Sequence, residues 1–517
     1  LEANTTANRN SAFGRASLNS NTTGADNTAV GYYALKQNTT GTRNIAIGAE
    51  ALDASVGIND NVAIGYQAQT SNTGNGATAN TGASNIAIGS YALKSLNSTS
   101  SGDSIQNVAI GVEAMESSTS AYRNVAIGFR AFESNQTQNN TVAVGWYALR
   151  ESVSGGSNTA LGHYTLTRTT TGASNTAVGS ATLQYNTTGS YNTGVGHRAL
   201  DQATTADGNT AVGYQALYLN TDGHSNASVG SYALDANTTG DNNTAIGYAS
   251  LSGNTTASNN TAVGNQSLFA NTTGANNDAF GYVALASNTT GSDNCAFGAG
   301  ALDANTTASY NTAMGRDAAG SNTTGAYNVA MGRAALATNT TGGHNVALGQ
   351  QALYANNANN NVAVGSVALV SNTTGTNNVA IGYAAMYTNT TAQNNTAIGY
   401  APLYANTTGT QNTAVGSVAL DANTTGSNNT SIGFSNMGAN TTGSNNVAVG
   451  SYCMDIGTAF NYNVAMGHDA ARHITTGSNN ICLGHAAGHS NSPSGQITAS
   501  SNNVVLGNNS ISNLYCA

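Results

Sequence analysis

The chain of 517 residues has little charge and no strongly charged segment. Charged residues make up 7% of it, against roughly 25% in an ordinary globular domain. Thirteen basic and 22 acidic residues give a net charge of −9, and no Lys/Arg cluster provides a surface for a nucleic-acid backbone. No apolar stretch approaches the ~20 residues of a membrane-spanning helix. We therefore expect neither nucleic-acid binding nor membrane insertion by this segment.

Cysteine, proline and aromatic residues are also scarce. The four cysteines have no CxxC spacing and are too sparse for a disulfide scaffold. Only two prolines occur, and aromatics make up 6%. The 61 glycines do not recur at every third position, which excludes collagen. With 39% apolar residues, the chain is not of the charge-rich disordered kind either.

The dominant feature of the chain is a tandem repeat. The string Asn-Thr-Ala-Val-Gly at 27–31 returns as Asn-Ile-Ala-Ile-Gly at 44–48 and many more times. Its glycine, here called the anchor glycine, occurs 29 times, and 24 of the 28 spacings between successive anchors are 17 residues. The other four spacings are 24, 22, 16 and 23 residues. Such regularity predicts one array of like units rather than several domains.

The repeat predicts an all-β fold, a parallel β-solenoid or β-roll. Gly, Asn and Thr are poor helix formers and occur several times in every unit. We expect two short strands per turn, one over the Asn-Thr-Ala-Ile-Gly string and one over the Ala-Leu segment after it. The Asn-Thr-Thr-Gly stretch forms a corner at which Gly takes a positive φ. The 29 turns stack about 4.8 Å apart.

Equivalent positions form columns, and each column has an expected orientation. Large apolar residues precede the anchor glycine in all 29 repeats and stand four residues after it in 25, so we expect these two columns to form the core. Ala stands two residues before the anchor in 24 repeats, on the opposite strand face. A column of consistently small side chains indicates that another backbone approaches closely, as in a closed homo-oligomer. The alternative is that these side chains fill a narrow interior within one chain. The predicted axis-packing residues are Ala29, Ala46, Ala245, Ala414 and Cys482.

A column of Asn is equally regular. Asn stands four residues before the anchor glycine in 28 of 29 repeats, with Thr141 as the exception. Stacked in register, these side chains predict a hydrogen-bonded Asn ladder along the array.

At these positions the chain resembles a known family. The strings Asn-Val-Ala-Ile-Gly at 61–65 and 378–382 are similar to the head repeats of trimeric autotransporter adhesins of the YadA type. The resemblance covers essentially the whole chain, although the period of 17 is longer than the usual head repeat. It implies a left-handed parallel β-roll and a homotrimer, with two further copies of the chain as partners.

A second resemblance lies at the C-terminal end. Residues 503–516 are similar to the segment that leads into the endosialidase-type intramolecular chaperone domain of phage tail fibres and tailspikes. That resemblance implies a further domain downstream, and the mid-repeat position of Leu1 leads us to expect upstream residues too. The expected organisation is a continuous β-roll shaft over 1–489 with loop insertions at 70–84 and 95–106. An insertion, the last repeat and the C-terminal end occupy 490–517.

Two carboxylates suggest catalysis, but the context does not favour it. Glu116 and Glu133 stand five residues after the anchor in adjacent turns. Their expected ~5 Å separation suits a retaining glycosidase. The column is expected to face solvent, Arg150 follows in the next turn, and no groove is indicated. We therefore expect no catalytic residue and no enzymatic activity, with a tailspike glycan depolymerase as a minor alternative.

Two histidines and the Thr columns suggest further minor alternatives. His468 and His485 stack in one column, with His473 and His489 nearby and Cys482 in the small column, and imidazole and thiolate are transition-metal ligands. The spacing matches no standard site, so we expect no metal and no cofactor. The Asn-Thr-Thr triplet occurs 16 times. Regular Thr arrays on flat solenoids can match ice, but here only one Thr column faces outward, at a corner, so an ice-binding solenoid is less favoured.

Aromatic residues beside the anchors suggest glycan or surface binding. Several follow an anchor glycine directly, and two in the fifth column fall one turn apart, so that they can stack on each other or on a sugar ring. Covering of the outer strand surface is the alternative. The insertions are better candidates for specificity, since recognition sites tend to lie on loops. The expected glycan-contact residues are Tyr32, Tyr33, Trp146, Tyr147, Tyr387 and Tyr404.

Taken together, these features predict an extracellular structural and adhesive fibre. The favoured function is a phage tail fibre shaft that mediates attachment to a host-surface glycan or protein receptor. A bacterial surface adhesin of the trimeric autotransporter class is the alternative and differs mainly in its anchor. The expected location is accordingly a virion tail fibre or a bacterial cell surface.

Overall fold

The fold is a parallel β-solenoid, seen here in a computed structural model that describes residues 2–70, 84–96, 105–492 and 495–511. The chain forms two compact units, residues 1–260 and 261–517, which are described in turn. The described residues contain 29 strands of three residues each and no helix, so none of them forms an apolar helix that could cross a bilayer. The predicted fold class and turn length are confirmed.

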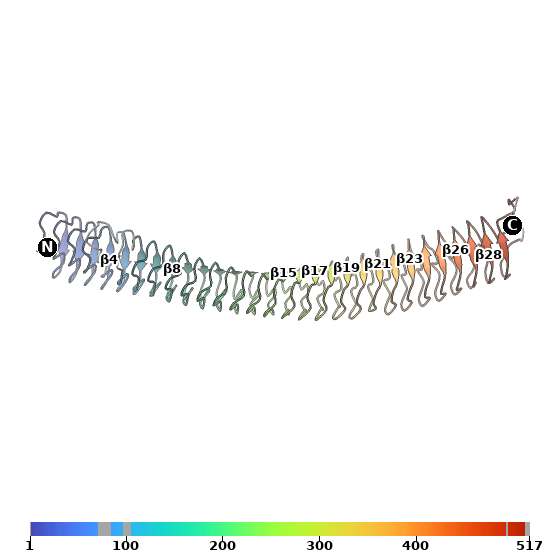
Figure 1. The fold of residues 1–517 in the computed structure, drawn as a ribbon, viewed down its shortest axis with the longest axis horizontal. Helices are drawn as coiled ribbons and strands as arrows, with labels where there is room; N and C mark the ends of the chain where they lie inside the picture. Colours follow the sequence, from blue (N-terminus) through green and yellow to red (C-terminus); the bar gives the residue numbers. More distant parts are fainter. Residues whose placement is uncertain (1, 71–83, 97–104, 493–494, 512–517) are drawn as a thin grey trace. The chain divides into compact units, whose positions relative to one another are not determined.

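The first unit is a stack of 14 strands, one per turn, and each strand pairs in parallel with the next (Figure 1). Equivalent residues of successive turns lie opposite each other, as Ala12 does to Ala29. The strands are β1 (Ser11–Phe13), β2 (Thr28–Val30), β3 (Ile45–Ile47), β4 (Val62–Ile64), β5 (Ile86–Ile88), β6 (Val108–Ile110), β7 (Val125–Ile127), β8 (Val142–Val144), β9 (Thr159–Leu161), β10 (Thr176–Val178), β11 (Thr193–Val195), β12 (Thr210–Val212), β13 (Ala227–Val229) and β14 (Thr244–Ile246).

The second unit stacks its 15 strands in the same parallel, in-register manner. The strands are β15 (Thr261–Val263), β16 (Asp278–Phe280), β17 (Cys295–Phe297), β18 (Thr312–Met314), β19 (Val329–Met331), β20 (Val346–Leu348), β21 (Val362–Val364), β22 (Val379–Ile381), β23 (Thr396–Ile398), β24 (Thr413–Val415), β25 (Thr430–Ile432), β26 (Val447–Val449), β27 (Val464–Met466), β28 (Ile481–Leu483) and β29 (Val504–Leu506).

The irregular spacings do not disturb the register. Val62 pairs with Ile86 across the 24-residue spacing, and Ile481 pairs with Val504 across the 23-residue one. The inserted residues therefore leave the column pattern unchanged. Residues 71–83 and 97–104 of the predicted loop insertions lie outside the described part of the chain.

The predicted second strand of each turn is wrong, because the Ala-Leu segment has alternating left-handed residues. In the turn after Gly31, Tyr33 has φ 60° and Leu35 has φ 49°. The Tyr33 N–H donates back to the Arg15 carbonyl of the preceding turn (3.1 Å). The Leu35 N–H instead donates forward to the Ala51 carbonyl of the next turn (3.0 Å). The segment is thus bonded to both neighbouring turns without the pleat of a strand.

Positive φ is also found at a different glycine from the one predicted. The anchor Gly31 has φ 138°, whereas the corner Gly24 is not left-handed. A Cβ on Gly24 would instead collide with the carbonyl of Gly41 in the next turn. The corner glycine is therefore required by the close approach of successive turns.

The column of small residues lies inside each turn. Ala29, Ala46, Ala245, Ala414 and Cys482 are 0% exposed within the single chain. The prediction that they pack around an axis between copies is therefore wrong, and the alternative of a narrow interior holds. A Cβ on Gly194, which stands in this column, would lie 2.6 Å from Thr182 Cγ2 and 3.5 Å from Leu183 Cδ1. The small column thus faces the two buried columns that stand three and four residues after the anchor glycine, and these leave room for little more than a methyl group.

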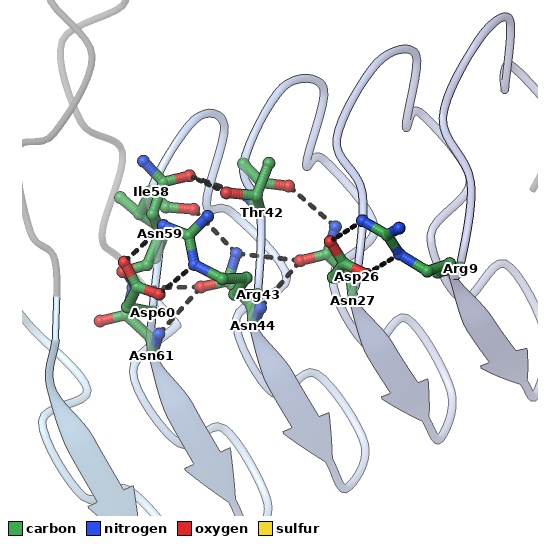
Figure 2. A network of polar contacts seen from close by, with 11 residues as sticks. Arg9, Asp26, Asn27, Thr42, Arg43, Asn44, Ile58, Asn59, Asp60 and Asn61 are labelled. Atoms are coloured by element: carbon green, nitrogen blue, oxygen red, sulfur yellow. Dashed lines mark hydrogen bonds and ion pairs between the residues drawn. The ribbon is translucent and has the colours of Figure 1, made fainter.

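The predicted Asn ladder is confirmed (Figure 2). The backbone N–H and the Nδ2 of Asn44 both donate to Asn27 Oδ1, at 2.9 and 3.1 Å. Asn61 repeats both bonds onto Asn44, and all three side chains are fully buried. Each amide thus hydrogen-bonds the turn on either side of it.

A second ladder, missed from the sequence, follows the Asn of the Asn-Thr-Thr triplets. Asn38 Nδ2 donates to Asn21 Oδ1 of the preceding turn (2.8 Å) and to the Gly41 carbonyl of its own corner (3.1 Å). The first Thr is also engaged, since Thr39 Oγ1 donates to the Val56 carbonyl (3.0 Å). Because Asn21 and Asn38 are fully buried, these triplets are not accessible as glycosylation acceptors in the folded chain.

Removing one amide from the first ladder is expected to destabilise the neighbouring turns. Asn192 Oδ1 accepts from the N–H and Nδ2 of Asn209, and Asn192 Nδ2 donates to the Ala206 carbonyl (2.7 Å). Asn192→Ala removes the partner of the Asn209 backbone N–H and of the Ala206 carbonyl, at a cost of about 1–3 kcal/mol each, whereas Asn209 Nδ2 keeps its bond to the Gly223 carbonyl. We expect faster amide hydrogen exchange in β11 and β12 and a lower urea midpoint. Thr188→Ala, at an exposed corner position, is the matched control and should change neither.

Candidate functional site

The strand face that points outward is largely apolar. Around its buried central residue each strand presents two outward side chains, and the one before the anchor glycine, expected in the core, faces out instead. Val30 is 36% exposed, Ile246 42% and Phe297 55%. Among the outward positions of the described strands, Asp278 is the only charged residue. Other outward apolar residues with high exposure are Ile45, Ile47, Ile127, Val142, Leu161, Val195, Val229, Met314, Met331, Ile381, Ile398, Ile432, Met466, Ile481, Val504 and Leu506.

The extent of this face, here called the outward strand face, is unusual for a monomer. Soluble monomers rarely expose contiguous apolar patches beyond a few hundred Å². Over the 14 strands of the first unit, at ~4.8 Å per turn, the apolar column directly before the anchor glycine runs for roughly 60 Å. The other outward column has Ser or Thr in seven of the 14 strands and Ile, Val or Ala in the rest. A surface of this kind typically contacts another protein.

Aromatic side chains beside the anchors form clusters. The rings of Tyr32 and Tyr33 stack at 3.8 Å between centroids, and Lys36 Nζ lies 4.0 Å from the Tyr33 ring. Tyr387 and Tyr404 stack at 5.1 Å and 8°, as the sequence suggested. Tyr404 is 40% exposed, so one edge of this pair remains open to solvent.

The largest aromatic cluster surrounds Trp146. Trp146 contacts Tyr147 within its own turn, Phe129 in the turn before and His163 in the turn after, at 5.5–6.0 Å between ring centroids. Trp146 itself is 52% exposed. The sequence analysis missed Phe129 and His163, although both stand one residue after an anchor glycine and hence in the Trp146 column.

Charged residues form a ladder in the column five residues before the anchor (Figure 2). Arg9 pairs with Asp26, and Arg43 pairs with Asp60, through Nη2–Oδ2 bonds of 2.9 and 2.8 Å. The guanidinium partner lowers the pKa of both carboxyls. These pairs are exposed, so solvent screening keeps their contribution to stability small.

The two carboxylates considered for catalysis are held in ion pairs. Oxygens of Glu116 and Glu133 lie within 4.8 Å of each other, close to the expected separation. Lys94 Nζ lies 3.5 Å from Glu116, and Arg130 Nε lies 3.8 Å from Glu133. Burial raises the pKa of Glu133. The two glutamates therefore belong to a half-buried cluster that contains both acidic and basic side chains.

The structure brings His468 and His485 together but not Cys482. The imidazole rings stack at 5.6 Å and 19°. Cys482 is fully buried in the small column, and burial raises the pKa of its thiol to about 11, so the thiolate is disfavoured.

The described surface of the second unit also has a shallow cavity. Its volume is about 410 Å³, and Asp303, Asp317 and Tyr354 line it. Two further lining residues, Gly320 and Ala337, stand five residues after an anchor glycine and have small side chains.

The fifth column is only partly exposed to solvent, contrary to expectation. Asp201 has no exposed side-chain surface; its Oδ2 lies 3.4 Å from Arg198 Nε, and its Oδ1 is buried without a hydrogen-bond partner among the described residues. Burial raises the pKa of this carboxyl. The same cause raises the pKa of the column equivalents Asp53, Asp235, Asp303 and Asp421.

These carboxyls predict that mild acid stabilises the fold. When the folded pKa is above the unfolded value of about 3.9, the contribution to stability is complete below that value and is lost as pH rises through the folded pKa. The urea midpoint should therefore rise between pH 7 and about pH 4. Asp201→Asn should raise the midpoint at pH 7 and flatten this dependence, whereas exposed Asp293→Asn should do neither. A midpoint that falls on acidification would contradict the assignment.

Comparison of the sequence with models of known protein families finds no match, and comparison with curated proteins finds none either. The functional proposals below therefore rest on the chain's own geometry and on the resemblances of its repeat and its C-terminal segment.

Proposed function

We propose that this chain is the shaft of an extracellular fibre in which three copies associate through their outward strand faces. A solenoid whose turns are bonded in register through backbone and buried amides suits a fibre-like structural role. The observation that carries the proposal is the outward strand face of each unit, which has a large apolar side chain at one position in every turn and at a second position in about half of the turns. Among the described residues, no side chain of the same chain covers this face at the highly exposed positions named above.

A second copy of the chain is the partner that matches this face best. Its side chains repeat at the spacing of the turns, and another copy presents the same repeat. Val, Ile, Leu, Met and Phe side chains from two copies can interdigitate at each turn, and closed symmetry then buries the face of every copy equally. The trimer, rather than a dimer, follows from the resemblance of the repeat to trimeric β-roll heads.

The proposal predicts the mass in solution and its loss on mutation. Light scattering should give about 155 kDa, which is three times 51.7 kDa. Val229→Glu with Ile246→Glu places buried charges between copies and should yield 51.7 kDa chains that keep their β circular dichroism. The control, Thr188→Glu with Thr239→Glu, adds the same charge at exposed corners and should remain trimeric. A monomeric wild-type chain would contradict the proposal, and a dimer would contradict its stoichiometry.

We propose in addition that the fibre attaches to a host-surface glycan through exposed aromatic rings. The Trp146 cluster supports this best, because rings from three successive turns meet edge to face around Trp146, which is itself half exposed and can stack on a sugar ring. Tyr32 with Tyr33, and Tyr387 with Tyr404, are smaller aromatic clusters. A protein receptor is the other candidate partner.

Glycan binding is testable on an array of bacterial surface polysaccharides. Trp146→Ala with Tyr147→Ala should weaken binding at least about tenfold, as expected when aromatic anchors worth more than about 1.4 kcal/mol are removed. Tyr282→Ala removes an exposed aromatic from the Trp146 column and should leave binding unchanged. An equal loss of glycan affinity in both variants would show that the Trp146 cluster is not the binding site.

The setting of the fibre is a phage tail in the favoured proposal and a bacterial surface in the alternative. The gene sequence around this segment separates the two. A virion attachment region with a chaperone domain supports the phage fibre, and a coiled coil with a membrane barrel supports the adhesin. A depolymerase using Glu116 and Glu133 would instead release reducing sugar from host polysaccharide.

A further inference from the structure

The last turns of the second unit place two histidines directly above one another. His468, His485 and Asn508 each follow an anchor glycine, and β27, β28 and β29 pair in register, so the three side chains form one column. Histidine occurs twice more in this column, at 163 and 197, but each time without a histidine in the neighbouring turn. Adjacent histidines at this position are therefore specific to the C-terminal turns.

A carboxylate completes a set of three donors. His468 Nδ1 lies 3.0 Å from Asp469 Oδ2. One ligand atom from each of His468, His485 and Asp469 lies within 4.8 Å of the others. Ligands of one ion lie about 2.0–2.2 Å from it, so the three atoms must approach by a small rotation of side chains. The two imidazoles are exposed and can rotate without any change in the backbone.

One neighbouring residue holds the His485 ring in place, and another competes with a bound cation for Asp469. His485 Nδ1 lies 3.1 Å from Asn508 Nδ2, so the last turn holds that ring in place. Arg472 Nη1 lies 3.0 Å from Asp469 Oδ1, and a bound cation would compete with this ion pair. Two imidazole nitrogens with one carboxylate oxygen form a donor set typical of Zn²⁺ and related transition metals.

We propose that His468, His485 and Asp469 bind one divalent transition-metal ion, of which Zn²⁺ is the representative. The ion links the turn of β27 to the turn of β28. The metal acts as a clip between these two adjacent turns. This site is independent of the proposed trimer and of glycan binding.

Zn²⁺ binding to the full, untagged chain tests the site by titration calorimetry. We expect one ion per chain. His468→Ser and His485→Ser should each weaken binding at least about tenfold, since loss of even an outer-shell partner costs about 10–100-fold. Asp469→Asn should weaken it as well. Serine is chosen because it occupies this column in many other turns, as at Ser366 and Ser417, so folding should be retained.

The matched control is His197→Ser, which removes a histidine from the same column where it has no histidine neighbour. It should bind Zn²⁺ as the wild type does. A second readout is amide exchange in β28, which should slow about 100-fold when free Zn²⁺ is 100 times the Kd, and not in His485→Ser. Wild-type affinity in both His468→Ser and His485→Ser, or an equal loss in His197→Ser, would overturn the proposal.

Discussion

Hydrogen bonding between successive turns, in fixed register, is the constraint on which everything else in this protein depends. Backbone N–H groups bond to the turn before or after, and even the left-handed Ala-Leu segment keeps this pairing through Tyr33 and Leu35. Because register is kept across the insertions, residues one repeat apart share one environment. The chain is therefore best understood as a set of columns, each with a single chemical role.

Close stacking also limits what the interior can hold. The buried space of a turn accommodates one Leu column and two Ala columns, such as those of Ala29 and Ala34, together with two columns of Asn amides. The Asn side chains satisfy the buried polar backbone groups at the corners, because each amide both donates and accepts hydrogen bonds. The large β-branched residues of the strand cannot fit inside and face outward. The same constraint that makes the turn thin thus creates the apolar surface proposed to join three copies.

Functional chemistry arises where a column departs from its consensus. Neighbouring departures become contacts, as in the Trp146 cluster, the Arg9–Asp26 pair and the stacked His468 and His485. His197, by contrast, has no histidine in a neighbouring turn and stacks on Tyr214 of the next turn instead. Site formation in this fold therefore depends on substitutions in adjacent turns.

The sequence by itself determined the period, the parallel stacking, the Asn ladder and the stacking of Tyr387 on Tyr404, because a strict repeat of 17 places equivalent residues in columns. Only the tertiary structure decided which way the columns point. The alternation of a strand shows that Ala245 and Ile246 lie on opposite faces but not which face is inside. That choice depends on the width left by Leu side chains across the turn. The left-handed residues of the Ala-Leu segment set that width, and the pattern of apolar residues does not reveal them.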